Sequence, residues 1–176
     1  MYALVFKRLV DFIMASIGII VLIPVFTVIF IILIFVNNGR PLFFQESPDK
    51  DEPIFKIMKF KTMTDKKDAS GNLLPNEDRM TACGSFLRRT SLDETPQLIN
   101  VLMGNMSLTG SRPLRLHYLP YYTKEEAIRH NLRPGITWLT QISDRNALSW
   151  DKKLAIGIGY GFVTKYISKK FSCKFH

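Results

Sequence analysis

The sequence has few of the residues that build metal centres and disulfide frameworks. Its 176 residues include only 2 cysteines and 3 histidines. Cys83 and Cys173 lie far apart and without a CxxC spacing, so they indicate neither a zinc site nor a disulfide framework, which fits a reducing cytoplasm. The histidines show no metal-ligand spacing and are interpreted as non-catalytic.

Acidic residues are scarce relative to basic ones. The chain has 15 Asp and Glu against 24 Lys and Arg, which gives a formal net charge of +9. Such an excess suits nucleic acid, anionic lipid headgroups or phosphorylated substrates, and composition alone does not separate them. The chain lacks a nucleic-acid-binding motif and any interleaving of aromatic and basic residues, which argues against a nucleic-acid partner.

Charge is absent from a long segment near the N-terminus. No Asp, Glu, Lys or Arg occurs from Phe12 to Val36, a run longer than the roughly 20 residues with which a helix crosses a bilayer. No small-residue cleavage site follows, which argues against a cleaved signal peptide. The run is also too uniformly apolar for a core helix of so small a protein. It predicts a membrane anchor over residues 1–38.

The flanks of this segment bear on its topology. Lys7 and Arg8 precede it and Arg40 follows it, so a simple span would place one basic end outside the cell, against the positive-inside tendency. Pro24 removes a backbone hydrogen bond and bends the helix. We therefore favour a re-entrant helix whose two basic ends face the same anionic surface. A kinked spanning helix stays open as the alternative.

The rest of the chain, from residue 39 onward, predicts one small domain that mixes short strands and helices. Its apolar patterns and turn residues carry this prediction. The expected elements are strands within 41–45 and 54–63, a polar loop over 46–53, a short helix from Gly84, a helix over 96–103 that Gly104 ends, and a helix over 114–130 that Pro120 interrupts.

An adjacent acidic pair stands out in the domain. Ser91 and Glu94 match the capping box S-x-x-E, a purely structural role. Alternatively, Thr95 caps the helix with Pro96 at its first position. Asp93 and Glu94 would then lie just before a helix N-terminus, where anions, including a bound phosphate, are favoured.

The pair also suits phosphoryl chemistry. A carboxylate can attack phosphorus and hold the phosphoryl group as an acyl phosphate. A diphosphate is anionic, so the attack needs a divalent cation and arginines that offset charge. The second carboxylate could bind the metal or transfer a proton. The candidate arginines, whose guanidinium groups match phosphate oxygens, are Arg88, Arg112, Arg133 and Arg145.

Taken in order, these residues resemble the small monotopic phosphoglycosyl transferases of the bacterial sugar transferase family. The resemblance runs from Met1 to about Lys153. It rests on the basic start and proline-broken apolar helix, Lys56 to Met63, Arg88 with Ser91 to Leu98, Asn100 to Leu102, Gly104 to Ser107, Arg112 to Leu114, and Arg133 to Thr137.

The resemblance implies an α/β fold that is mainly α, with a re-entrant membrane helix and a small catalytic domain over residues 39–153 whose amphipathic helices lie at the membrane interface. It also implies a two-step reaction on the cytoplasmic face of the bacterial inner membrane. Asp93 would attack the β-phosphate of a UDP-sugar and release UMP, and polyprenyl phosphate would then take the phosphosugar. Mg²⁺ is the implied cofactor, close to Asp93, with Glu94 assisting. Other glycan-pathway enzymes are possible partners. The residues expected to bind substrate phosphates or the nucleotide are Lys59, Arg88, Arg112, Arg133, Gln141 and Arg145.

Several positions depart from the family pattern. Ile23 stands where a serine usually precedes the helix-breaking proline, and Trp138 replaces a glycine. Beyond Lys153 the match is lost, and we expect a divergent, truncated or frameshifted tail over residues 154–176. These departures motivate a second hypothesis, a catalytically impaired membrane-bound relative with a scaffolding role or none.

Overall fold

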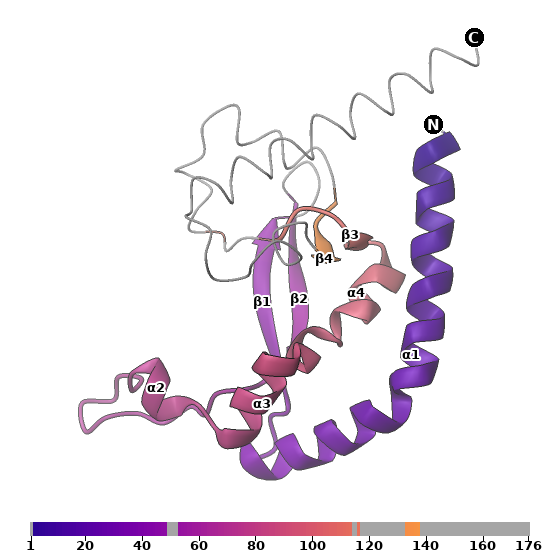
Figure 1. The fold of residues 1–176 in the computed structure, drawn as a ribbon. Helices are drawn as coiled ribbons and strands as arrows, with labels where there is room; N and C mark the ends of the chain where they lie inside the picture. The colour runs from indigo at the N-terminus through magenta and orange to yellow at the C-terminus, as the bar shows by residue number, and fades with distance from the viewer. Residues whose placement is uncertain (1, 49–52, 114–115, 117–132, 138–176) are drawn as a thin grey trace.

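The structure, a computed structural model, describes residues 2–48, 53–113, 116 and 133–137. Helices and strands are mixed within these residues, as predicted (Figure 1). The elements are α1 (Tyr2–Val36), β1 (Leu42–Pro48), β2 (Ile54–Phe60), α2 (Asn76–Arg79), α3 (Ala82–Thr90), the 3-10 helix η1 (Leu92–Glu94), α4 (Gln97–Met103), β3 (Ser107–Thr109) and β4 (Gly135–Thr137). The helix predicted over 114–130 and the tail lie outside the described residues, apart from residue 116.

The apolar segment forms α1, which bends along its course (Figure 1). Val5–Val36 is long and apolar enough to cross a membrane, judged by length and composition. Pro24 lies inside this helix, where its missing N–H weakens the ladder. The hydroxyls of Ser16 and Thr27 bond to carbonyls four residues earlier, so these polar groups are satisfied within the helix. α1 is one continuous helix through Pro24, and the break near Pro24 and the re-entrant topology stay predictions.

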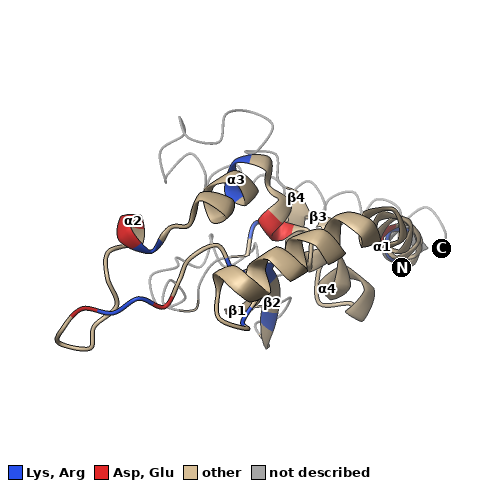
Figure 2. Cartoon of the chain, turned by 90° about the horizontal axis from the view of Figure 1, so that it is seen from below, with Lys and Arg blue, Asp and Glu red and all other residues tan. Residues whose placement is uncertain are grey.

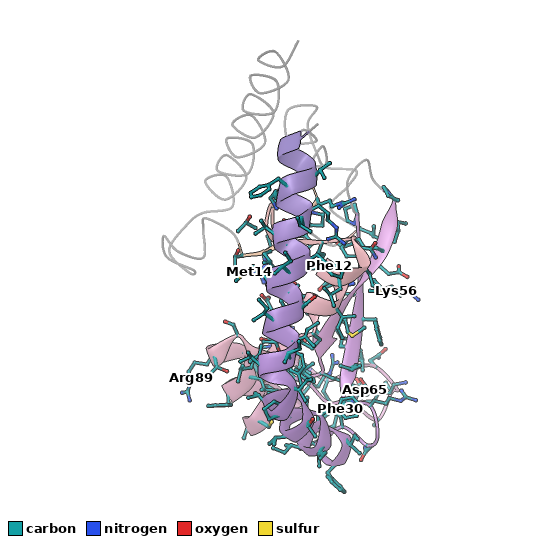
Figure 3. All side chains as sticks on the ribbon, turned by 90° about the vertical axis from the view of Figure 1, so that its right-hand side faces the viewer. Phe12, Met14, Phe30, Lys56, Asp65 and Arg89 are labelled. Atoms are coloured by element: carbon teal, nitrogen blue, oxygen red, sulfur yellow. The ribbon has the colours of Figure 1, made fainter. Side chains whose placement is uncertain are left out.

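Most of the α1 surface is apolar and exposed. Figure 3 shows side chains projecting from several sides of this helix. Phe6, Ile20 and Phe35 are 67%, 67% and 79% exposed. A surface of this kind needs an apolar cover, because soluble monomers rarely leave so large a patch in water.

β1 and β2 form an antiparallel hairpin. Its register runs from Leu42 opposite Phe60 to Pro48 opposite Ile54. The loop predicted from Glu46 was therefore wrong at its start, because β1 keeps its pairing as far as Pro48. Backbone pairing outweighs the polar side chains of this stretch, and the local pattern does not reveal it.

The two central helices have well-defined ends. α3 begins after Thr81, whose side-chain oxygen accepts a 2.8 Å hydrogen bond from the Gly84 amide. It ends at Ser91, where φ is +60°. α4 ends at Gly104 with φ of +97°, which confirms the predicted stop, because glycine adopts this conformation without steric cost.

α1 packs onto the domain on both sides of Pro24. The first cluster joins α1 to β2, α4 and the start of β3, and its buried members are Ala15, Phe55, Ile57, Val101 and Met106. The second joins α1 to β2 and α3, and its buried members are Ile29, Leu33, Phe60 and Leu87. The predicted anchor is therefore part of the hydrophobic core on both arms of the bend.

A polar junction of Lys7, Asp11 and Ser107 holds the first arm to β3. The buried Asp11 carboxylate accepts hydrogen bonds from Lys7 Nζ at 2.9 Å, Ser107 Oγ at 2.7 Å and the Leu108 amide at 3.3 Å. Lys7 Nζ also contacts Ser107 Oγ. A buried carboxylate needs such partners, because an unpaired one pays a large desolvation cost.

Arg8 binds the C-terminal end of α4. Its guanidinium donates to the carbonyls of Val101 at 2.5 Å and Leu102 at 3.0 Å, at the helix end that attracts cations. The Val101 carbonyl also accepts a 3.1 Å hydrogen bond from the Gly104 amide. Lys7 and Arg8 were predicted as membrane-surface residues. That role stays a prediction, but both side chains have protein partners that the sequence pattern did not indicate.

The polar junction predicts a stability effect. Asp11→Asn keeps the size of the side chain but removes its charge, so Lys7 loses its counter-ion inside the contact. We expect thermal unfolding in detergent, followed by circular dichroism, at a lower temperature, with a loss of about 1–3 kcal/mol. The matched control is Glu77→Gln on the exposed helix α2, which should leave the midpoint unchanged. Equal midpoints for both variants would contradict the role given to Asp11.

Candidate functional site

The acidic pair lies in η1, the tight turn between α3 and α4. The Glu94 amide donates to the Ser91 carbonyl at 3.3 Å, and the Thr95 amide donates to the Leu92 carbonyl at 3.3 Å. Both helix starts considered from sequence are wrong. Ser91 does not cap with its side chain, and Thr95 Oγ1 donates to the Leu92 carbonyl at 2.7 Å. Consecutive turns of η1 and α4 satisfy these groups instead.

Glu94 joins three separate segments of the chain. Its Oε1 accepts a hydrogen bond from Arg112 Nη2 at 3.0 Å and lies 3.8 Å from Lys59 Nζ. Lys59 comes from β2 and Arg112 from the segment after β3. Figure 2 shows the acidic stretch after α3 near the centre of the molecule, with basic segments close to it. The structure thus brings together Lys59, Asp93, Glu94 and Arg112, four of the residues selected from the sequence.

Burial dominates the electrostatics of this cluster. Burial raises the pKa of Asp93, the charge of Glu94 raises it further, and Lys59 and Arg88 oppose the rise. Burial lowers the pKa of Lys59, while Glu94 acts against this shift. A desolvated carboxylate next to cations is less stabilised by water and correspondingly more ready to react.

Arg88 reaches the cluster from the last turn of α3. Its Nε donates to Thr62 Oγ1 at 3.0 Å, and its charge acts on both Asp93 and Lys59. Sequence reasoning selected Arg88 but missed Thr62. The available signal was the position of Thr62 in the basic motif that ends at Met63.

Two loops, residues 110–113 and 133–135, each combine an arginine with a proline and a glycine, and they meet in the structure. β3 and β4 are parallel, and the Gly135 amide donates to the Ser111 carbonyl at 2.9 Å. A Cβ added at Gly110 would lie 2.5 Å from the Arg133 carbonyl oxygen, and one at Gly135 would lie 2.0 Å from the Gly110 nitrogen. Only glycine permits this approach. Arg112 and Arg133 are therefore carried by one unit, although Arg133 is exposed.

Two predicted site residues, Gln141 and Arg145, lie outside the described residues, as does Trp138. Among the residues that the structure describes, no group of three or more His, Cys, Asp or Glu could hold a metal ion. The adjacent carboxylates of Asp93 and Glu94 still fit Mg²⁺, which is commonly bound by one or two carboxylates together with water and substrate phosphates.

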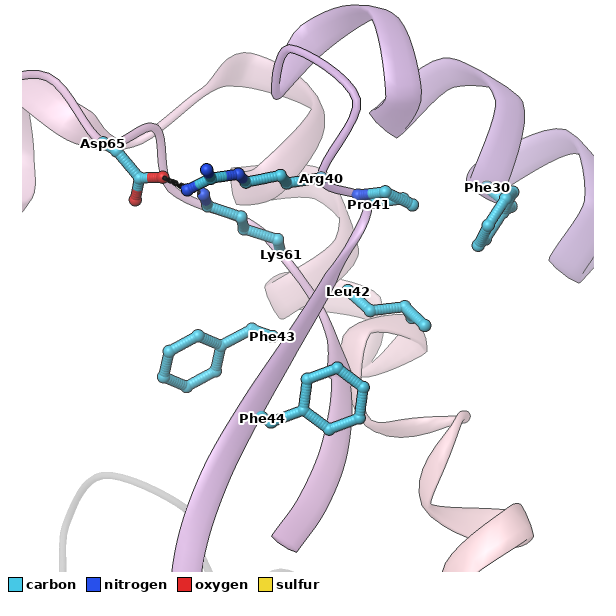
Figure 4. A pocket seen from close by; sticks show the side chains of 8 residues that line it. All are labelled: Phe30, Arg40, Pro41, Leu42, Phe43, Phe44, Lys61 and Asp65. Atoms are coloured by element: carbon cyan, nitrogen blue, oxygen red, sulfur yellow. Dashed lines mark hydrogen bonds and ion pairs between the residues drawn. The ribbon is translucent and has the colours of Figure 1, made fainter.

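A cavity of about 510 Å³ opens between α1 and the start of the hairpin (Figure 4). Its wall combines the rings of Phe30, Phe43 and Phe44 with the charges of Arg40, Lys61 and Asp65. Arg40 Nη1 lies 3.9 Å from Asp65 Oδ2, and the hydrogen bond from Lys61 lowers the pKa of Asp65. Neither Asp93 nor Glu94 lines this cavity, so the acidic pair, rather than the cavity, marks the candidate site.

Comparison with known proteins agrees with this arrangement. The profile of the family described as bacterial sugar transferase matches residues 2–168. The chain belongs to this family. The resemblance inferred from the sequence motifs is thereby confirmed, and the match includes α1 as well as the segment that carries the acidic pair.

Several curated sugar transferases are similar to this transferase. One is the uncharacterized sugar transferase EpsL of Bacillus subtilis, 44% identical over 89% of this chain and 78% of that protein. The exopolysaccharide production protein ExoY of Rhizobium meliloti is 32% identical over 88% of this chain and 76% of that protein. The UDP-glucose:undecaprenyl-phosphate glucose-1-phosphate transferase of Klebsiella pneumoniae is 38% identical over 80% of this chain but only 31% of its own length.

The desolvated site of the transferase predicts that a loss of charge stabilises the fold. Because the pKa of Asp93 is raised, folding disfavours its ionised form, and Asp93→Asn removes that cost. We expect the thermal midpoint in EDTA at pH 7 to rise by a few degrees. Screening by solvent keeps the effect to about 1 kcal/mol or less.

The pH dependence tests the sign of this effect. The cost exists where Asp93 is ionised and disappears as the pH falls through its raised pKa. The gap between variant and unaltered protein should therefore close toward acid pH. A gap of constant size, or a lowered midpoint for Asp93→Asn, would refute the interpretation.

Proposed function

We propose that this sugar transferase is a phosphoglycosyl transferase that moves a sugar phosphate from a UDP-sugar to polyprenyl phosphate at a membrane. The observation that carries the proposal is the partly buried pair Asp93 and Glu94, surrounded by cationic side chains in a domain that packs against a long apolar helix. The names of relatives support the substrate classes. One relative is a UDP-glucose:undecaprenyl-phosphate glucose-1-phosphate transferase, and another is a UDP-galactose-lipid carrier transferase.

Asp93 is proposed as the nucleophile. One of its carboxylate oxygens attacks the β-phosphorus of the UDP-sugar, and the bond from that phosphorus to the bridging oxygen breaks. UMP leaves with the bridging oxygen and its electron pair, while the phosphosugar stays on Asp93 as an acyl phosphate. An oxygen of polyprenyl phosphate then attacks the same phosphorus and displaces the Asp93 carboxylate.

Glu94 has a different proposed task. Its carboxylate is bound by Arg112 at 3.0 Å and lies 3.8 Å from Lys59, so it holds two cations beside the nucleophile. Together with Arg88, these cations offset the charge that collects on the phosphoryl oxygens. A guanidinium can engage two of those oxygens at once. Arg133 is assigned to the same phosphates because its loop is joined to that of Arg112.

Mg²⁺ is the proposed cofactor, and the carboxylates of Asp93 and Glu94 are its candidate protein ligands. When bound, the metal would neutralise diphosphate charge and favour departure of UMP. The chain's own residues would orient the donor and exclude water from the acyl phosphate. The partial burial of Lys59 and Asp93 supports the latter role.

The membrane is the proposed location, with the catalytic domain on the cytoplasmic face of the bacterial inner membrane. The exposed apolar surface of α1 would contact lipid, and the bend in α1 fits a re-entrant path. This arrangement would bring a lipid-borne acceptor to the site. The assembled charge cluster supports an active enzyme over the impaired relative suggested by Trp138 and the altered tail.

The proposed chemistry predicts release of UMP. The purified transferase, given undecaprenyl phosphate and Mg²⁺, should release UMP from at least one donor in a panel that includes UDP-glucose and UDP-galactose. Asp93→Asn should reduce this rate by about a thousandfold or more, because it removes the attacking group. EDTA should also abolish release.

A matched control separates chemistry from charge. Asp78→Asn makes the same change on exposed α2, and its UMP release should equal that of the unaltered protein. No release from any donor by a folded preparation would favour the impaired relative. Full activity of Asp93→Asn would remove the proposed nucleophile.

The bend in α1 predicts a topology. An epitope placed before Met1 and another inserted at Gly71, in the exposed loop before α2, should be accessible from the same side of the membrane. Antibody binding to inside-out vesicles should detect both, and intact spheroplasts should hide both. Detection on opposite sides would show a spanning helix instead.

A further inference from the structure

Thr62 lies behind the site and has a fixed position. Its residue is 5% exposed. The Thr62 carbonyl accepts two hydrogen bonds from Thr81, one from the Thr81 amide at 3.4 Å and one from Thr81 Oγ1 at 3.3 Å. A Cβ at Gly84 would lie 1.9 Å from the same carbonyl oxygen, so the first turn of α3 fits closely against Thr62. The segment after β2 is thus fastened to the start of α3.

The side chain of Thr62 faces the far end of the same helix. Its Oγ1 accepts a 3.0 Å hydrogen bond from Nε of Arg88, a residue that is otherwise exposed. Threonine is stiff at χ1 because it is branched at Cβ, so its oxygen is a rigid acceptor. The guanidinium is planar, and a bond to its Nε fixes the directions in which both Nη groups point.

The orientation of Arg88 has a direct effect on the acidic turn. The charge of Arg88 acts on both Asp93 and Lys59, although these residues belong to different elements. A long exposed side chain would otherwise sample many rotamers, and ordering it for each turnover would cost conformational entropy. The hydroxyl of Thr62 removes much of this freedom before substrate arrives.

We propose that Thr62 is a positioning residue that holds the Arg88 guanidinium toward the diphosphate of the donor. The proposal rests on the proposed function, because it assigns Arg88 to the phosphates of that substrate. Thr62 itself touches no reacting atom. It acts by aligning the Arg88 guanidinium, whose binding of phosphate depends on its orientation. A bidentate contact needs both Nη groups in the plane of the phosphate oxygens.

The test uses Thr62→Val, which keeps the shape of the side chain and removes the acceptor. We expect kcat/KM for UMP release to fall by about tenfold to a hundredfold, with the larger share in kcat. Thr62→Ser keeps the hydroxyl and should retain most of the activity. Thr62→Ala, which adds no bulk, replaces the valine variant if that variant does not fold.

A double-mutant cycle with Arg88→Gln asks whether Thr62 acts through Arg88. If it does, Thr62→Val should cause little further loss of kcat/KM in the Arg88→Gln background. Losses that simply multiply would show that Thr62 acts independently and would overturn the proposal. The matched control is Thr64→Val, whose hydroxyl bonds to the Arg79 carbonyl outside the cluster, and its kcat/KM should be unchanged.

Protection by UDP supplies a readout that does not need turnover. UDP should raise the thermal midpoint of the unaltered protein, and Thr62→Val should shrink this shift to the level seen for Arg88→Gln. UMP release that fails for every donor while this coupling is present would count against the proposed function alone. Normal UMP release and an undiminished UDP shift in Thr62→Val would overturn the role of Thr62 alone. Absence of both UMP release and UDP protection in the unaltered protein would overturn both.

Discussion

The packing of α1 against the domain is the contact on which the rest of the structure depends. The helix contributes Ala15 to one buried cluster and Ile29 with Leu33 to the other, so neither core is complete without it. The hairpin, α3 and α4 are short elements that could not bury enough apolar surface by themselves. The helix α1 therefore has two roles. It presents an exposed apolar surface, and it completes the cores that hold the elements on either side of the acidic turn.

The acidic turn is stabilised by its neighbours rather than by its own backbone. η1 is a single 3-10 turn, which is a weak element. Glu94 fastens it to β2 through Lys59 and to the segment after β3 through Arg112. Removing charged groups from water costs free energy, and mutual pairing recovers part of it. The desolvated charges of such a site lower the stability of the fold and raise the reactivity of the carboxylate.

Local patterns predicted what is locally determined. The apolar run, the end of α4 at Gly104 and the acidic pair all follow from neighbours within a few residues. The predicted cap of α4 was wrong because two capping patterns, one from Ser91 and one from Thr95, overlapped in the sequence. Tertiary packing selected neither. The pairing of β1 beyond Glu46, the Asp11 contacts with β3 and the Thr62 to Arg88 bond join distant segments, and such pairs leave no mark in a single sequence.

The backbones of Gly110 and Gly135 approach so closely that the two loops carrying Arg112 and Arg133 form one rigid unit. Neither backbone can shift without displacing the other, because no side-chain layer lies between them. For protein engineering, this means that the segments around Arg112 and Arg133 form one exchangeable module. A chimaera with another family member would have to transplant both together, or the grafted loop would meet a backbone shaped for a different partner.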